Sequence, residues 1–285
     1  MTTLYAIAHA KLNLTLDVVG RRPDGYHNLE MVMQEITLGD EVTLTLGTGK
    51  PWALVGEGGE MPRDDSNIAW RAAALFFEAA GMDCEGLTVE IQKRTPVCAG
   101  MGGGSADGAA VLRLLQDYYG RPIPEETLYA IAEQVGSDVP FALFGGTALA
   151  REKGQILTRL SPFPHCEIVL CKPNFPISTP ALFRAVDRAE ITRRPDTKAM
   201  TDAIAAGDLV KAASLLCNVF EPIVEADHPE IREIRETMLS GSALGAAMTG
   251  SGPTVFGLFE DPAAAKAVYE TLRPVYPDTF LTAPV

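Results

Sequence analysis

The most constraining segment of the chain is RTPVCAGMGGGSADGAAVLRLL, residues 94–115, because four of the five residues at 100–104 are glycine. Each glycine costs the fold roughly 0.5–1 kcal/mol relative to alanine, since the unfolded chain has more freedom to lose. Val111, Leu112, Leu115 and Tyr119 follow with the spacing of one helix face. The segment therefore predicts a glycine-rich loop leading into a helix N-terminus, where N–H groups and the helix dipole can hold an anion.

The composition is ordinary for a soluble globular protein. Of the 285 residues, 47% are hydrophobic and 21% are charged, so we expect one large domain or two of moderate size. No apolar run reaches the ~18 residues of a membrane span, and the N-terminal segment lacks the basic start of a signal peptide. The five cysteines form no CxxC pair. We therefore expect free thiols and a cytoplasmic location.

The charge restricts the partners that the chain can have. A formal net charge of −13 argues against a nucleic-acid partner, which would need a clustered basic surface. A phosphorylated small molecule remains possible, because a few fixed cations and a helix N-terminus can hold phosphates in an acidic protein. The cysteines and the four histidines are not clustered, so we expect no structural zinc. The sequence leaves the oligomeric state open.

Helix and strand patterns alternate irregularly, which favours an α+β fold over a doubly wound parallel sheet. A proline-rich segment at 160–166 suggests two domains, 1–160 and 161–285. Strands are predicted at 4–19, 29–37, 41–46 (joined to the previous strand by Gly39 and Asp40), 87–93, 146–151, 155–160, 167–172 and twice around 248–259. Helices are predicted at 67–80 (capped by Ser66 or Asn67), directly after the glycine loop, at 125–135, after 176–180, and at 198–206, 208–219, 230–239 and 262–272.

The glycine spacing excludes two common phosphate loops. A Walker A loop, GxxxxGK[ST], needs a lysine after the glycines, and none follows here. A dinucleotide fingerprint, GxGxxG, that starts at Gly100 would need glycine at 105, where the chain has serine. A packing or turn role for the glycines stays open as the alternative to phosphate binding.

Four motifs occur in order along the chain. They are AHAKLNLTLDVVGRRPDGYHNLE (8–30), PVCAGMGGGSADGAAVL (96–112), GSDVPF (136–141) and MTGSGPTVFG (248–257). Together they resemble the GHMP kinases, whose phosphate loop has the form PxxxGLGGGSS. The opening motif resembles the branch of this family that acts on 4-diphosphocytidyl-2-C-methyl-D-erythritol, on the non-mevalonate route to isoprenoids. The resemblance covers nearly the whole chain and is weakest across 185–240.

The resemblance implies a fold and a reaction. The expected fold is the two-domain GHMP kinase fold, with an N-terminal domain like domain 2 of ribosomal protein S5 and a ferredoxin-like C-terminal domain. The expected reaction is transfer of the γ-phosphoryl group of ATP to the 2-hydroxyl of the cytidylyl substrate. Two alternatives stay open: another small-molecule GHMP kinase, and a non-catalytic sensor of sugar or nucleotide on the same fold.

The resemblance assigns catalysis to Lys11 and Asp138. Phosphoryl transfer needs mainly positioning and charge stabilisation, with one group to accept the hydroxyl proton. Asp138 is expected to be that group, with Lys11 beside it to keep the carboxylate ionised and to stabilise the developing alkoxide. Taken alone, Asp138 is equally typical of a turn or cap residue, and Lys11 of a solvated strand residue.

ATP is expected along the glycine loop, held by backbone N–H groups, with Mg²⁺ arriving on the nucleotide. Met101 replaces the usual leucine of the family loop and Ala106 its second serine, while Cys98 and Ala99 stand where glycine is frequent. Ser105 could contact a phosphate or the metal, whose protein ligands are unassigned. The residues expected to contact ATP are Asn67, Lys93, Pro96, Val97, Cys98, Ala99, Gly100, Met101, Gly102, Gly103, Gly104, Ser105 and Ala106.

Four residues are expected to bind the substrate. Tyr26 can stack on cytosine and His27 can hydrogen-bond a base edge, although alone they are typical of a turn aromatic and a surface histidine. By resemblance, Asn13 contacts the methylerythritol hydroxyls and Phe183 is a second aromatic over the cytosine. The segment TGSGPTVFG, 249–257, is either a simple turn between strands or a loop beside the substrate site.

Overall fold

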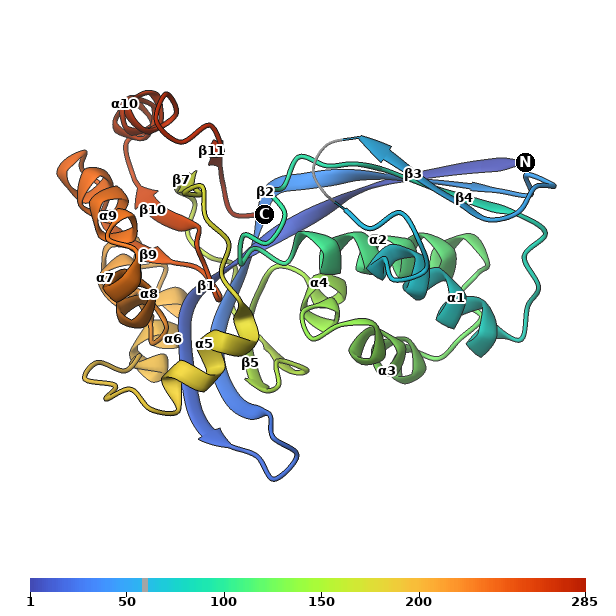
Figure 1. Cartoon of the computed structure of the whole chain (residues 1–285), viewed down its shortest axis with the longest axis horizontal. Coiled ribbons are helices and arrows are strands. Elements are labelled where there is room, and N and C mark those ends of the chain that lie inside the picture. Colours follow the sequence, from blue (N-terminus) through green and yellow to red (C-terminus); the bar gives the residue numbers. More distant parts are fainter. Residues whose placement is uncertain (58–60) are drawn as a thin grey trace. The chain divides into compact units, whose positions relative to one another are not determined.

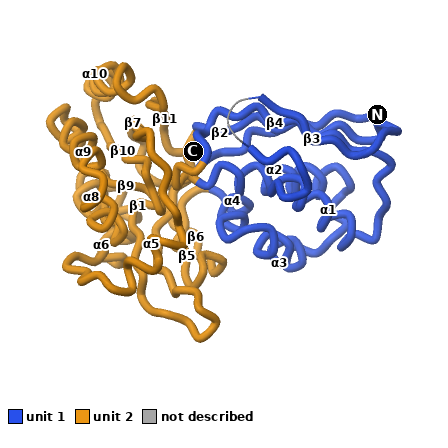
Figure 2. The backbone as a smooth tube through the Cα atoms, viewed as in Figure 1, with its two compact units in different colours: residues 1–10, 38–97, 102–145 blue, residues 11–37, 98–101, 146–285 orange. Residues whose placement is uncertain are grey.

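The computed structural model describes residues 1–57 and 61–285, which form two compact units interleaved along the sequence (Figure 2). Unit 1 contains Met1–Ala10, Leu38–Val97 and Gly102–Gly145; unit 2 contains Lys11–Thr37, Cys98–Met101 and Gly146–Val285. The two longest strands and the glycine-rich loop each supply residues to both units. The domain boundary expected at residue 160 stays a prediction.

Two long strands, β1 (Thr2–Arg21) and β2 (His27–Leu46), begin the fold, joined by the turn predicted at Pro23–Gly25. The prediction that the second strand breaks at Gly39 and Asp40 is wrong. A Cβ at Gly39 would lie 2.6 Å from the Ala8 carbonyl oxygen, so glycine permits a close approach inside the strand. The buried Asp40 carboxylate accepts hydrogen bonds from the backbone N–H groups of Arg94 and Thr95, at 2.6 and 2.7 Å.

Unit 1 is a helical layer against a sheet (Figure 1). Strand β4 (Leu87–Gln92) pairs antiparallel with β2 and parallel with β3 (Ala53–Glu57), which the sequence did not predict. The helices on one face of these strands are α1 (Ile68–Ala80), α2 (Gly103–Tyr118), α3 (Glu125–Val135) and the unpredicted α4 (Val139–Phe144).

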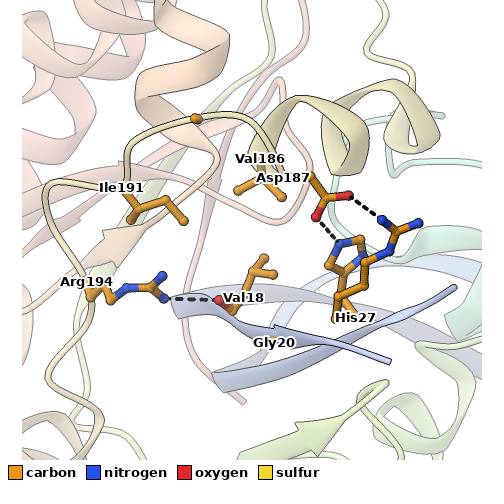
Figure 3. A pocket seen from close by; sticks show the side chains of 9 residues that line it. Val18, Gly20, His27, Val186, Asp187, Ile191 and Arg194 are labelled. Carbon is orange, nitrogen blue, oxygen red and sulfur yellow. Dashed lines mark hydrogen bonds and ion pairs between the residues drawn. The ribbon is translucent and has the colours of Figure 1, made fainter. Parts of the chain in front are cut away.

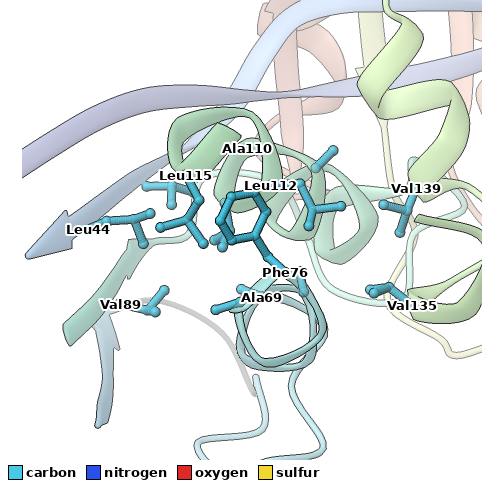
Figure 4. Close-up of a cluster of buried hydrophobic side chains, with 14 of the residues drawn as sticks. Leu44, Ala69, Phe76, Val89, Ala110, Leu112, Leu115, Val135 and Val139 are labelled. Carbon is cyan, nitrogen blue, oxygen red and sulfur yellow. The ribbon is translucent and has the colours of Figure 1, made fainter. Parts of the chain in front are cut away.

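The core of unit 1 fixes the position of α2. Phe76 of α1 packs with Leu112 and Leu115 of α2 over Leu44 and Val89 of the sheet, and all five side chains are fully buried (Figure 4). Burial of one such side chain contributes about 1.5–3 kcal/mol. The helix that follows the glycine loop is therefore held firmly along its apolar face.

Unit 2 contains the remaining strands. β5 (Thr147–Glu152) pairs antiparallel with β2 and with β6 (Ile156–Arg159), while β8 (Cys217–Asn218) pairs parallel with β1. A separate antiparallel sheet has the order β11-β7-β10-β9. Its strands are β7 (Glu167–Cys171), β9 (Gly245–Met248), β10 (Val255–Phe259) and the unpredicted β11 (Thr279–Thr282).

Six helices accompany these strands in the described part of unit 2. The predicted helix at 208–219 is wrong in its second half, because α7 ends at Ser214 and Asn218 turns its amide to the carbonyl oxygens of Met248 and Gly250, each at 2.8 Å. The helices are α5 (Thr179–Val186), α6 (Thr197–Ala205), α7 (Leu209–Ser214), the unpredicted α8 (Glu221–Asp227), α9 (Glu230–Ser240) and α10 (Pro262–Leu272).

The α+β prediction is confirmed, since most strand pairs are antiparallel and helices and sheets form separate layers. Among residues 1–57 and 61–285, no helix combines the length and the apolar character that a bilayer crossing requires.

Candidate active site

The glycine-rich loop leads directly into α2, as the sequence predicts. Gly102 is the N-cap of α2 in the left-handed conformation, with φ 67°. The helix ladder opens with the hydrogen bond from the Ala106 N–H to the Gly102 carbonyl, at 2.9 Å. The N–H groups of Gly103, Gly104 and Ser105 therefore precede the ladder and, with the helix dipole, suit an anion.

The side chains of this loop differ in exposure. Those of Ala99, Met101 and Ala106 are buried, so only their backbone groups can face a nucleotide. Cys98 is exposed and has φ 54°, in the region that favours glycine. Pro96 and Val97 are half-buried.

Gly100 brings the loop against the connection between β9 and β10, within unit 2. Gly100 has φ 76°, and a Cβ there would lie 2.5 Å from the Thr249 carbonyl oxygen and 2.9 Å from the Gly252 nitrogen. No side chain fits at this contact. The segment that begins at Thr249 is thus a connection between strands that also packs on loop residues; its place beside a substrate stays a prediction.

Lys11 is buried on β1, so the alternative of a solvated strand residue is wrong. Its ammonium donates to Asn13 Oδ1 at 2.7 Å and to the Gly100 carbonyl at 2.9 Å. The buried Asn13 donates its backbone N–H to Thr249 Oγ1 at 2.9 Å. Unit 2 therefore brings Lys11, Asn13, Gly100 and Thr249 into one group, which we call the Lys11 cluster.

Asp138 is the half-buried N-cap residue of α4, in unit 1, but its side chain makes no capping hydrogen bond. Helix capping therefore does not explain why an aspartate stands at this position. A Cβ at Gly136, two residues earlier, would lie 3.8 Å from Ser105 Oγ. The start of α2 and the turn that carries Asp138 are thus neighbours in unit 1. Lys11 belongs to unit 2, and its pairing with Asp138 stays a prediction.

Lys93 lies beside the start of α2, where a Cβ on Gly103 would be 3.4 Å from its Nζ. The buried ammonium forms ion pairs with Asp107 Oδ2, at 2.9 Å, and with Asp40. Burial lowers the pKa of Lys93, but the two carboxylates more than offset this and raise it. Its expected contact with ATP stays a prediction.

Asp107 and Asp40 were not predicted as site residues. Asp107 precedes Val111 by four residues, so the helical spacing could have predicted that its carboxylate lies on the apolar face of the helix. Its Oδ1 has no hydrogen-bond partner among the described residues. Burial, reinforced by Asp40 and opposed by Lys93, raises the pKa of Asp107 to about 7.

This titration predicts a pH-dependent stability. The folded-state pKa of about 7 exceeds the ordinary value of 3.8, so unfolding releases the Asp107 proton between these values. The contribution of Asp107 to the free energy of unfolding should therefore fall by about 2–4 kcal/mol as the pH rises from about 4 to about 7. Urea unfolding at pH 5 and pH 8 should show a smaller fall for Asp107→Asn than for the unaltered protein. The exposed Asp117→Asn on the same helix is the control, and parallel pH profiles for Asp107→Asn and the unaltered protein would contradict the prediction.

Asn67 caps α1, as expected from the sequence. Its Oδ1 accepts the Ala69 N–H and its Nδ2 donates to the Pro62 carbonyl, each at 2.8 Å. A Cβ on Gly108 would lie 2.7 Å from Ile68 Cγ2, so the starts of α1 and α2 pack together. Asn67 therefore lies near the helix that follows the loop, although both polar atoms of its side chain serve local structure; its contact with ATP stays a prediction.

The structure brings two of the four expected substrate residues together. The ring of His27, at the start of β2, stacks on that of Phe183 with centroids 4.9 Å apart and planes at 20°. His27 is buried, so its alternative as a surface histidine is wrong, and its Nε2 lies 2.7 Å from Asp187 Oδ1. Tyr26 is exposed in the turn, with Lys153 Nζ 5.1 Å from its ring centroid.

A cavity of about 230 Å³ opens beside His27 in unit 2 (Figure 3). Its walls include Asp187 and the apolar side chains of Val18, Val186 and Ile191, with Arg194 bonded to the Val18 carbonyl at 3.1 Å. Tyr26, Phe183 and Asn13 do not line it. Asp187 was missed because its segment falls where the family resemblance is weakest.

The chain matches two family models. The model described as GHMP kinases N terminal domain matches residues 67–146, which contain the glycine loop and Asp138, and the model described as GHMP kinases C terminal matches residues 200–278. The chain belongs to the GHMP kinase family.

Within the GHMP kinase family, the chain is similar to proteins that share one enzyme name. A protein from Pelotomaculum thermopropionicum named 4-diphosphocytidyl-2-C-methyl-D-erythritol kinase is 45% identical, over 95% of this chain and 94% of its own. A protein of the same name from Alkaliphilus metalliredigens is 39% identical over 96% and 94%. A crystal structure of 4-(cytidine 5'-diphospho)-2C-methyl-D-erythritol kinase has a TM-score of 0.83 at 34% identity, covering 99% of both chains. The homoserine kinase of Cytophaga hutchinsonii, at 17% identity and a TM-score of 0.77, shares the fold.

Proposed function

We propose that this chain is an ATP-dependent kinase that phosphorylates the 2-hydroxyl of 4-diphosphocytidyl-2-C-methyl-D-erythritol, a step toward isopentenyl diphosphate. The observation that carries the proposal is the Lys11 cluster, in which a buried ammonium is held by the Gly100 carbonyl of the glycine loop and by Asn13. The named relatives, similar along nearly the whole chain, support this substrate over those of other GHMP kinases.

In the proposed reaction, the Asp138 carboxylate accepts the proton of the 2-hydroxyl. The hydroxyl oxygen then bonds to the γ-phosphorus, the bond from that phosphorus to the β–γ bridging oxygen breaks, and ADP leaves. Lys11 stabilises the negative charge that develops on the acceptor oxygen. The N–H groups of Gly102–Ser105 hold the transferred and remaining phosphates.

Magnesium is part of the proposal as a companion of ATP. Mg²⁺ keeps most of its waters and binds phosphate oxygens, so it needs few protein ligands. Ser105 carries the only hydroxyl among residues 102–106, and this hydroxyl lies toward the turn that precedes Asp138. These residues fit a nucleotide-borne ion, which would neutralise phosphate charge during transfer.

We further propose that Tyr26 stacks on the cytosine, His27 and Phe183 complete the base site, and Asn13 contacts the methylerythritol hydroxyls. A cytoplasmic location and the division at residue 160 remain parts of the proposal that rest on sequence.

The experiment that tests this function measures ADP release by the purified protein with ATP and a panel of alcohols. We expect turnover with the cytidylyl substrate and none with homoserine, mevalonate or galactose. Turnover with one of these others would instead select another GHMP kinase activity. Nucleotide binding without turnover on any alcohol would favour a sensor.

The chain contains its own reporter of nucleotide binding at the loop. Cys98 is exposed, whereas burial raises the pKa of the Cys166 and Cys171 thiols to about 12. N-ethylmaleimide should therefore modify Cys98 well before those two cysteines. Peptide mass analysis should show that a non-hydrolysable ATP analogue, at a concentration about tenfold above its Kd, slows this modification by about tenfold, because only the free protein then reacts. Equal rates with and without the analogue would contradict phosphate binding at this loop; GTP at the same concentration is the control for nucleotide choice.

A further inference from the structure

Phe183 in the last turn of α5 and Asp187 at its C-cap hold the His27 ring, one at its face and the other at its edge. Phe183 stacks on the ring, and Asp187, four residues later, places Oδ1 2.7 Å from Nε2. Residues four apart share a helix face, so both contacts come from the same side of α5. Figure 3 shows the Asp187 carboxylate directed at the His27 ring beside the cavity. The plane and the rotation of this buried imidazole are therefore both defined.

The contact with Asp187 also determines which ring nitrogen carries the proton. The hydrogen bond from His27 lowers the pKa of Asp187, and Arg21 Nη1 lies 3.9 Å from the other carboxylate oxygen. An ionised carboxylate only accepts hydrogen bonds, so the proton between the two groups lies on Nε2. In the neutral imidazole, Nδ1 is then an acceptor. Within the described parts of the chain, Nδ1 has no hydrogen-bond partner.

An acceptor at this position distinguishes the two pyrimidines. Cytosine linked through N1 has one donor group, the exocyclic amine at position 4, whereas its N3 and O2 accept. Uracil has a carbonyl oxygen at position 4 and its donor at N3. A lone pair on Nδ1 therefore attracts the edge of cytosine and repels the same position of uracil. When a bound base covers Nδ1, an acceptor left without a donor penalises the wrong base.

We propose that Asp187 is a specificity-determining positioning residue: it holds His27 as the Nε2–H tautomer, so that Nδ1 accepts from the 4-amino group of the base. This inference rests on the proposed function, because it presumes a cytidylyl substrate. Asp187 itself contacts His27 and not the reacting atoms, so it acts on the choice of substrate rather than on the chemistry.

The test compares kcat/KM for the cytidylyl substrate and for its uridylyl analogue, in the unaltered protein and in Asp187→Asn. An asparagine amide can donate to Nε2 and so permit the tautomer with hydrogen on Nδ1, which suits uracil. We expect the cytidylyl-to-uridylyl ratio to fall by about tenfold or more, through the KM of the alcohol, while the KM for ATP changes less than about twofold. Glu190→Gln, which removes an exposed carboxylate three residues further on, should leave the ratio unchanged.

A second measurement needs no turnover. Long-range ¹⁵N–¹H correlation spectra of the four histidines, with His27 assigned through His27→Gln, should show Nδ1 without hydrogen in the unaltered protein and hydrogen shared between both nitrogens in Asp187→Asn. If Asp187 had a purely structural role, its replacement would lower kcat/KM for both substrates equally. An unchanged cytidylyl-to-uridylyl ratio in an active Asp187→Asn variant would therefore overturn the specificity role alone. Hydrogen on Nδ1 in the unaltered protein would do the same. Failure of the unaltered protein to phosphorylate either substrate would overturn the proposed function, and this role with it.

Discussion

Replacement of Asp138 by asparagine is expected to lower kcat by about 10²–10⁴-fold, because the variant can no longer accept the proton of the hydroxyl. The fold should survive, since Asp138 makes no capping hydrogen bond to α4 and asparagine has nearly the same shape. ATP binding should be preserved as well, because the loop amides do not depend on this side chain. Rapid-quench measurement of ADP formation, with calorimetric titration of ATP, separates these effects.

Ser137→Ala, at the neighbouring exposed position, is the matched control for a change in this turn. It should retain kcat within about twofold, as for most exposed substitutions. Turnover near that of the unaltered protein in Asp138→Asn would remove Asp138 from the mechanism.

Replacement of Lys11 by methionine is expected to lower kcat by about 10²–10³-fold, as for loss of one group that stabilises transition-state charge. The variant also leaves Asn13 Oδ1 and the Gly100 carbonyl without their donor, which should cost about 1–3 kcal/mol of unfolding free energy. Urea unfolding and initial rates distinguish the two losses. Lys198→Met, which removes an exposed lysine paired with Asp202, should change neither.

The double variant Lys11→Met/Asp138→Asn tests whether the two residues act together. When two residues act as a unit, removing both lowers kcat little more than removing one of them. We therefore expect kcat of the double variant to lie within about tenfold of the weaker single variant. A loss equal to the product of the single losses would contradict the proposed partnership.

The loop and its helix were predictable because their determinants are local. A run of glycines followed by Val111, Leu112 and Leu115 at helical spacing specifies both a bare backbone and a buried face, and α2 begins at Gly103. Asn67 was predictable as a cap for the same reason, since its hydrogen bond reaches only two residues along the chain.

The missed features depend on contacts between distant segments. Gly39 and Asp40 have the composition of a turn, yet β2 continues through them because Ala8 approaches Gly39 and the backbone beyond Lys93 binds Asp40. From the sequence, Asp187 resembles any surface residue at a helix end, because its contact partner His27 is distant in the chain and β2 brings the two together. Likewise, nothing local in 208–219 reveals that Asn218 bonds carbonyl groups near residue 250.

We infer that the loop amides hold the triphosphate while Asp138 and Lys11 act on the acceptor hydroxyl. A crystal structure with a non-hydrolysable ATP analogue and 4-diphosphocytidyl-2-C-methyl-D-erythritol tests it most directly. We expect β- and γ-phosphate oxygens within hydrogen-bond distance of the N–H groups of Gly102–Ser105, and the substrate 2-hydroxyl within hydrogen-bond distance of the Asp138 carboxylate. A triphosphate bound elsewhere, with those amides facing only protein, would contradict it.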